Sequence, residues 1–266
     1  MIIILFFIAH WYLSLFCQTF FHHRYAAHAA FTMSKGWERF FFILSFIFQG
    51  SSYLSVRAYA VMHRMHHAYA DTELDPHSPA YSKNIFDMMW RTYKIYSGIY
   101  NRTIATDEKF NKNVPDWPVF EKIAGSNLAR LFWVVAYTWF YVAYASSPWL
   151  FLLLPVQILM SPVHGAVINW YAHKYGYKNF EMKNTAENLL HVDFLMLGES
   201  YHNNHHKHAS SVNFGFKWHE IDPVYIVILG LSKLGVIRIP KQRPVPIVTV
   251  AGEMNTVENQ EKENVY

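Results

Sequence analysis

The sequence contains a single cysteine and few charged residues. Cys17 has no second cysteine with which to pair, which excludes an internal disulfide and a cysteine-rich zinc site. Asp, Glu, Lys and Arg make up only 16% of the 266 residues, whereas soluble domains carry about 25%. Hydrophobic types make up 52% and aromatic types 18%. This composition excludes a disordered chain, a disulfide scaffold and an ordinary soluble enzyme.

Basic residues are absent from two stretches, 1–23 and 131–173, which are also the most continuously apolar. All 23 Lys and Arg lie in the rest of the chain. This distribution is typical of membrane-embedded segments with every basic loop on one side, which by the positive-inside rule is the cytoplasm. The basic residues are dispersed among apolar runs, so the formal net charge of +4 does not indicate nucleic-acid binding. We therefore predict a multi-pass integral membrane protein.

Three apolar segments are predicted to cross the membrane. Met1–Phe21 is uncharged and long enough for a crossing of roughly 20 residues, and it lacks the basic start and cleavage site of a signal peptide. Leu131–Ser147 and Pro148–Ile168 are predicted to form an antiparallel pair joined by a tight turn. Phe40–Val61 is predicted to be interfacial or re-entrant, because Arg57 interrupts it and a crossing there would separate the histidine clusters on either side.

These segments predict an all-α integral membrane protein with few spanning helices and a helical cytoplasmic cap. The polar segment 82–130 is predicted to be a cytoplasmic connector. One domain is expected over residues 1–244. Residues 245–266 are charged and lack a hydrophobic period, which predicts a disordered C-terminal tail.

Histidines are numerous, 16 in all, and most of the chemistry is expected from three short runs. The runs are His22, His23 and His28; His63, His66 and His67; and His202, His205 and His206. In the second and third runs the spacing i, i+3, i+4 places three imidazoles on one helix face, about 5–6 Å apart. A lone histidine is usually a surface or hydrogen-bonded core residue, but imidazole is also the commonest nitrogen ligand of transition metals. The clustering favours metal binding.

The number and type of donors indicate which metal. Eight or nine imidazoles are too many for one tetrahedral zinc ion, and electron-transfer copper sites use a cysteine and a methionine. Nitrogen donors without a thiolate therefore favour two ions, with iron as the redox metal. A membrane metal transporter is the alternative from another class, but it predicts ionisable residues along the spanning helices. Apart from Tyr and Cys17, the predicted spans offer only His10 and His164.

The combined motifs resemble those of the membrane fatty-acid desaturase superfamily, in particular its Δ9, stearoyl-CoA-type acyl desaturase branch. The resemblance covers roughly residues 15–240. Its HxxxxH box is matched by His23 and His28, its first HxxHH box by His63, His66 and His67 followed by YADTELDPHSP, its second HxxHH box by His202, His205 and His206 after Gly-Glu-Ser-Tyr, and its Asn-xxx-His element by Asn169 and His173.

The resemblance implies an oxygen-dependent enzyme that introduces a cis double bond, at the Δ9 position, into a saturated acyl-CoA or acyl-lipid. It implies a cofactor of two Fe²⁺ ions on a His-rich site in the cap. The implied ligands are His23, His28, His63, His66, His67, His173, His202, His205 and His206, with Asn169 acting through a water. The implied partners are the acyl substrate, O2, membrane lipid and a separate electron donor similar to cytochrome b5, ferredoxin or rubredoxin.

The resemblance also assigns roles around the metals. Gln49 and Ser161 are expected to line the acyl channel. Glu199 is expected to accept the outer N–H of a ligating imidazole, as carboxylates commonly do. His77 is expected to pack near the metals without binding them, and His22 to support a ligand or be exposed.

Three departures from the family pattern leave alternatives open. The family usually has four spanning helices, and this sequence begins inside what would be the second. An Arg-Asp pair that helps to bind CoA is replaced by Val61-Met62, so the headgroup could be CoA, acyl carrier protein or a glycerolipid. Related His-box proteins hydroxylate alkanes or lipids, and hydroxylation stays the alternative reaction.

Overall fold

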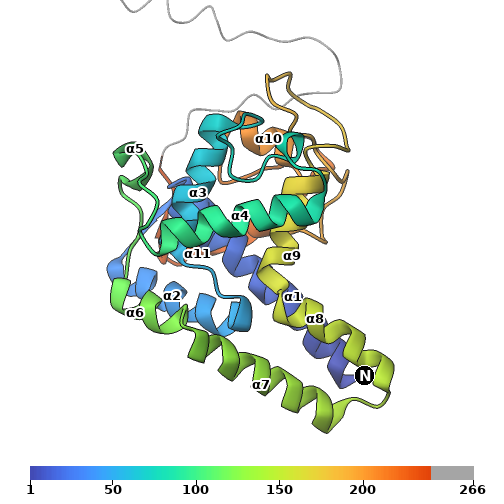
Figure 1. Ribbon diagram of the computed structural model, residues 1–266. Helices are drawn as coiled ribbons and strands as arrows, with labels where there is room; N and C mark the ends of the chain where they lie inside the picture. Colours follow the sequence, from blue (N-terminus) through green and yellow to red (C-terminus); the bar gives the residue numbers. More distant parts are fainter. Residues whose placement is uncertain (241–266) are drawn as a thin grey trace, which may run out of the picture.

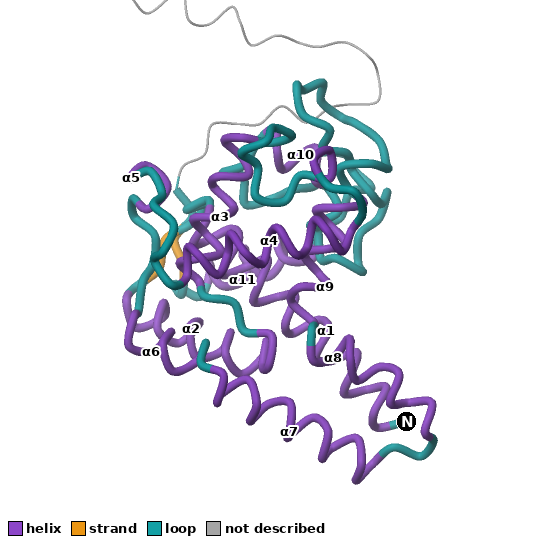
Figure 2. The backbone as a smooth tube through the Cα atoms, in the orientation of Figure 1, coloured by secondary structure: helices purple, strands orange, loops and turns teal. Residues whose placement is uncertain are grey.

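The computed structural model describes residues 1–240, so the predicted tail lies outside the described residues. The chain is mostly helical, with an elongated part built on α1, α7 and α8 and a second part that holds α3 and α10 among long loops (Figures 1 and 2). The helices are α1 (Ile2–Phe16), η1 (Cys17–Ala27), α2 (Lys35–Gln49), η2 (Gly50–Ser52), α3 (Val56–Tyr69), η3 (Pro79–Tyr81), α4 (Ile85–Tyr100), α5 (Glu108–Asn111), α6 (Pro118–Ala124), α7 (Asn127–Tyr144), η4 (Pro148–Leu153), α8 (Leu154–Ile158), α9 (Met160–Ala166), η5 (Val167–Tyr171), α10 (His202–Lys207) and α11 (Pro223–Lys233). The strands β1 (Thr32–Met33) and β2 (Ile237–Arg238) pair antiparallel, a small exception to the all-α prediction.

One helix in the described part of the chain is by itself long and apolar enough to cross a membrane. It is the 26-residue helix Ile2–Ala27, which joins α1 to η1. Two helix pairs, each bent at a short break, also have the length and composition of a span. Counted as one span each, they give at most three crossings in the described residues. The predicted span at Met1–Phe21 is therefore helical, and it continues into the segment that carries the first histidines.

The predicted antiparallel pair is present, but its second member is not straight. Pro148–Ile158 and Met160–Tyr171 are bent by 73°, because Pro162 has no N–H to donate to the carbonyl of Ile158. The hydroxyl of Ser51 donates to that carbonyl instead, over 2.8 Å. The helix is thus broken where a side chain from another element replaces the missing backbone hydrogen bond.

The first member of the pair, α7, presents an apolar face to its surroundings. It ends just before the Ser-Ser-Pro turn, as predicted, and packs against α8. It is not among the helices that pass the spanning test. Its exposed apolar residues nevertheless follow one face at helical spacing: Leu128, Leu131, Phe132, Val135, Trp139 and Val142. Such a face is typical of a helix that contacts lipid.

The segment predicted to be interfacial or re-entrant is also bent. The two helices α2 and α3 meet at 79° across η2. The hydroxyls of Ser34 and Ser55 cap their N-termini by accepting hydrogen bonds from backbone N–H groups. Gly50 lies at the break with φ 54°, and a Cβ there would lie 1.7 Å from the Tyr137 hydroxyl. Glycine is therefore required both by the left-handed backbone and by the close approach of α7.

A buried ion pair connects the first helix to the C-terminal part of the described chain. Arg24 donates to Asp222 over 2.9 Å, and both side chains are fully buried. The Asp222 carboxylate also accepts from the N–H groups of Phe214 and Tyr225 and so caps α11. A buried charge left without its partner is strongly unfavourable, so this pair fixes η1 relative to the segment that follows α10.

We expect Asp222→Asn to lower the free energy of unfolding by about 3–5 kcal/mol, because Arg24 would keep its charge without a buried counter-ion. The measurement is thermal unfolding of the detergent-solubilised protein. The matched control is Lys35→Gln, which removes an ion pair in which the Lys35 side chain is 80% exposed, and which should shift the transition little. Equal shifts for the two variants would contradict the role given to the buried pair.

Candidate metal centre

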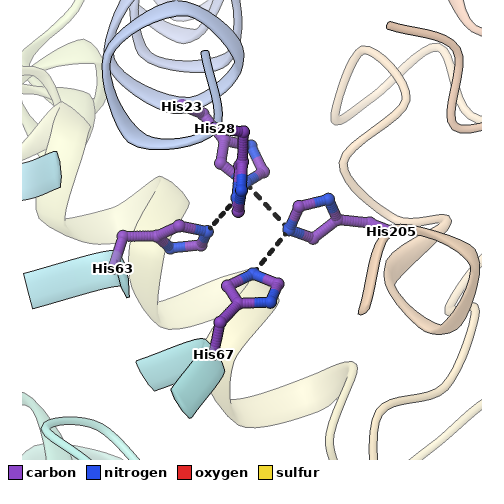
Figure 3. A group of neighbouring side chains, drawn as sticks. All are labelled: His23, His28, His63, His67 and His205. Carbon is purple, nitrogen blue, oxygen red and sulfur yellow. Dashed lines mark hydrogen bonds between the residues drawn. The ribbon is translucent and has the colours of Figure 1, made fainter. Parts of the chain in front are cut away.

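Five histidines converge from three segments that are distant in the sequence: η1, α3 and α10. His23 and His28 come from η1 and its C-terminal end, His63 and His67 from α3, and His205 from α10. Their ligand nitrogens all lie within 4.8 Å of one another. Figure 3 shows the five rings directed at a common point. We call these residues the five-histidine group.

The first two members are aligned by a π-helix. The N–H of His28 donates to the carbonyl of His23 over 3.1 Å, an i→i+5 bond. In an α-helix, residues five apart point in different directions, because the turn repeats every 3.6 residues. The wider π-helical turn brings both imidazoles to the same side. This is the physical reason why the chain can use the HxxxxH spacing.

A second group of four histidines lies beside the first. It consists of His66, His173, His202 and His206, again with ligand nitrogens within 4.8 Å of one another. Each HxxHH run is divided between the groups: α3 gives two residues to the five-histidine group and one to the four-histidine group, and α10 does the reverse. The structure thus brings together all nine histidines of the expected ligand set.

The spacing of the nitrogens matches a coordination sphere. Two metal–nitrogen bonds of about 2.0–2.1 Å at right angles place their nitrogens about 2.9 Å apart. The Nε2 atoms of neighbouring rings are separated by 2.8 Å in His28–His63 and His67–His205, by 3.0 Å in His23–His205, His173–His202 and His202–His206, and by 3.2 Å in His66–His206. These distances fit one ion in each group.

Carboxylates behind two of the rings fix which nitrogen carries the proton, and a third carboxylate lies near His173. The Nδ1–H of His23 donates to Glu199 over 2.9 Å, and that of His66 donates to Asp75 over 2.9 Å. The Nδ1 of His173 lies 3.6 Å from Asp71. A proton on Nδ1 leaves a lone pair on Nε2, directed into the group. Several lone pairs facing one another repel, and a bound cation converts this repulsion into attraction, so the donor set fits a metal.

The surroundings of the ligand histidines and of Glu199 favour the charge states that metal binding needs, neutral imidazoles and an ionised carboxylate. Burial and neighbouring imidazoles lower the pKa of His202, His205 and His206 well below the usual value, so these rings are neutral donors. Burial alone would raise the pKa of Glu199, but hydrogen bonds from His23 and Thr19 and the positive charge of Arg24 outweigh burial and lower that pKa. Glu199 is thus an ionised acceptor, in the position expected from the sequence.

The other histidines singled out in the sequence have different surroundings. His77 is buried with its ring centroid 4.2 Å from that of His66, and it lies in a small group with His66 and Asp75. His22 is fully buried between the carbonyls of Cys17 and Leu54, so of the two alternatives predicted for it the exposed one was wrong.

A cavity of about 1030 Å³ reaches the metal centre. His23, His63 and His202 line it, as do Asn169 and Ser161. Gln49 is not among its lining residues, and its side chain instead accepts a hydrogen bond from the Leu54 N–H over 3.0 Å.

Two features of the site escaped sequence reasoning. The hydroxyl of Thr185 lies 3.2 Å from His173 Nδ1 and donates to Asp71, but its segment has no pattern that points to the metals. One face of α4 lines the cavity along nearly the whole helix, from Phe86 to Tyr100. The amphipathic period of α4 was a usable signal for that face, although it could not tell which partner the face would have.

Known proteins resemble this chain over most of its length. Residues 1–232 match the family model described as fatty acid desaturase. The chain is 30% identical over 247 residues to the hex-5-enoyl-(acyl-carrier protein) acetylenase of Moorena producens, covering 85% of this chain and 73% of that protein. It is 26% identical over 226 residues to the sn-1 stearoyl-lipid 9-desaturase of Synechocystis (84% and 66% covered). It is 28% identical over 229 residues to the Delta-9 desaturase-like 4 protein of Arabidopsis thaliana (82% and 69% covered).

We expect Glu199→Ala to weaken metal binding by about 10- to 100-fold, because it removes the acceptor that orients His23. The measurement is a titration of the metal-free full chain with Fe²⁺ under anaerobic conditions. Glu73→Ala is the matched control, since Glu73 is exposed and its backbone carbonyl, not its side chain, accepts a hydrogen bond from Arg91. An unchanged affinity in Glu199→Ala would show that this carboxylate does not support the metal ligand.

Proposed function

The chain belongs to the fatty acid desaturase family, and from this premise we propose that it introduces a cis double bond into a saturated fatty acyl chain in an oxygen-dependent reaction. The observation that carries the proposal is the position of two histidine groups at the wall of one large cavity. Of the reactions considered for the sequence, this one uses both the metal ligands and the cavity.

We propose two Fe²⁺ ions as the cofactor. The five-histidine group would hold one ion and the four-histidine group the other, with Asn169 contributing through a water. When bound, the iron pair supplies the O2-dependent removal of hydrogen from an unactivated methylene, which no acid–base side chain can perform. The chain's own residues orient the donors: Glu199 and Asp75 accept the Nδ1–H groups of His23 and His66 and so hold these protons away from the metals.

The cavity would place the acyl chain beside this centre. Its wall contains Leu15, Met62 and Ile168 near the lining histidines, and apolar side chains of this kind exclude water from a reacting carbon. Desaturation at Δ9 is part of the proposal, supported by the names of the cyanobacterial and plant relatives. We further propose that Ser161 is a channel residue, whereas the geometry gives Gln49 no such role.

The proposed setting is a multi-pass membrane protein with the histidines on the cytoplasmic side. The apolar helix Ile2–Ala27 and the absence of Lys and Arg from residues 1–23 and 131–173 support it. The substrate would be an acyl-CoA or an acyl-lipid, and a separate cytochrome b5-, ferredoxin- or rubredoxin-like protein would deliver electrons.

Expression in a host that lacks unsaturated fatty acids tests the reaction. We expect a new monoene among the fatty-acid methyl esters, measured by gas chromatography–mass spectrometry, and its loss in His66→Ala. His191→Ala is the matched control, because His191 is exposed and lies outside both histidine groups. A hydroxylated product in place of the monoene would contradict desaturation and assign the chain to the hydroxylases.

Metal counting tests the division into two groups. His28 belongs only to the five-histidine group and His173 only to the four-histidine group. We expect His28→Ala and His173→Ala each to reduce bound iron from two ions to about one per chain, because the other group keeps all of its donors. Elemental analysis of the purified variants measures this. Loss of both ions from either variant, or zinc in place of iron in the wild type, would contradict the proposal.

A further inference from the structure

One face of α4 exposes large aromatic side chains. Phe86 is 82% exposed, Trp90 59% and Tyr93 57%. Their spacing of i, i+4, i+7 places them in a single stripe. The opposite side of the helix is buried against α3 through Met88 and Ile99. The helix therefore has one face that packs inside the protein and a second apolar face that no described residue covers.

The exposed stripe continues directly into the cavity. Phe86, Trp90 and Tyr93 line the cavity, and so do Tyr96 and Tyr100 one and two turns further along the same face. Exposure falls along the stripe, since Tyr96 and Tyr100 are only partly exposed. The same cavity contains His23, His63 and His202. The stripe and three histidines of the metal centre therefore line one and the same cavity.

The charges around this entrance do not suit a polyanionic headgroup. Arg130 is the only Lys or Arg among the residues that line the cavity. Its guanidinium already donates to the backbone carbonyls of Ser51 over 3.1 Å and Tyr53 over 3.2 Å. Several phosphates, as in CoA, are normally held by several cationic side chains. Among the described residues, the cavity wall at the entrance therefore offers aromatic surface and one occupied guanidinium, and the exposed Lys83 and Lys94 lie outside it, whereas the phosphates of a soluble acyl thioester would need several free cationic side chains.

The flank of the stripe has the chemistry of a membrane interface. Lys83 and Lys94 are exposed beside it and do not line the cavity. Aromatic rings at the headgroup level, with lysines that extend toward lipid phosphates, are typical of helices that lie in the interface. The cavity is also lined by Val134 of α7, the helix whose outer face is apolar, and Figure 1 shows α4 between α7 and the part that holds α10.

We propose that the Phe86–Trp90–Tyr93 face of α4 lies in the interfacial region of a bilayer and is the entrance through which the acyl chain of a membrane lipid reaches the cavity. The reaction of the acyl chain inside the cavity rests on the proposed desaturation. The position of α4 at the bilayer does not rest on it, because this position follows from the exposed stripe and its charges.

Fluorescence quenching tests the position without any catalysis. The full chain is reconstituted in phosphatidylcholine vesicles with and without bromine on the acyl chains near the headgroups. The emission of Trp90, taken as the difference between wild type and Trp90→Phe, should fall about twofold in brominated vesicles. Trp218→Phe is the matched control, because Trp218 is 84% exposed but does not line the cavity, and its emission should not change. Unquenched Trp90, or equal quenching of Trp218, would overturn the proposal.

A rate comparison tests the source of the substrate. Stearoyl chains are offered as phosphatidylcholine vesicles or as stearoyl-CoA at equal concentration, each with O2 and with reduced ferredoxin as the electron donor. We expect the lipid-borne chain to react faster, and Phe86→Ser to slow its reaction severalfold while Trp218→Ser does not. Faster reaction of stearoyl-CoA would overturn the lipid source in favour of a soluble thioester. Absence of product from both substrates, together with a quenched Trp90, would refute the proposed function and leave the membrane face of α4 supported.

Discussion

The mutual repulsion of imidazole lone pairs is the constraint on which the fold around the two histidine groups depends. Nine rings lie with Nε2 atoms as close as 2.8 Å, and carboxylates behind His23 and His66 keep the ring protons on the outer nitrogens. Such a cluster is unfavourable by itself, because buried lone pairs face one another without a donor between them. The surrounding fold must therefore hold the rings in place with interactions stronger than this repulsion.

The interactions that hold the rings are mostly buried and ionic. The pair Arg24–Asp222 connects the residue after His23 to the segment after α10, and the Asn204 side chain donates to Glu220 beside α10. Both contacts lie next to a ligand in the sequence but point away from the metals. Along η1 and α10, residues that face the histidine groups alternate with residues such as Arg24 and Asn204 that bind buried carboxylates. This alternation explains why many polar groups of these two helices are buried.

The sequence predicted the ligand faces because HxxHH is a helical spacing, and α3 and α10 are helices. It could not predict that each run serves both groups, because residues i+3 and i+4 diverge by about 100° around a helix and only the packed partner shows which group lies on each side. The π-helical turn between His23 and His28 was also missed, because its i→i+5 hydrogen bond leaves no pattern in the sequence. The bend before Pro162 was missed although the proline was a usable signal for it. The side chain of Gln49 accepts a hydrogen bond from the backbone of Leu54, a contact that the sequence did not indicate.

The helix α4 joins the wall of the cavity to the helix α3. Its buried face packs on α3, the helix that carries His63, His66 and His67, and its other face forms the cavity wall. Because protein interiors are close-packed, a helix cannot shift on one face without moving the other. The distance between a chain lying along α4 and the donors on α3 is therefore set by a single helix–helix interface. Changes in that interface should move the acyl chain relative to the metals while leaving every ligand in place, which gives the fold a means to vary the position of reaction without altering the metal centre.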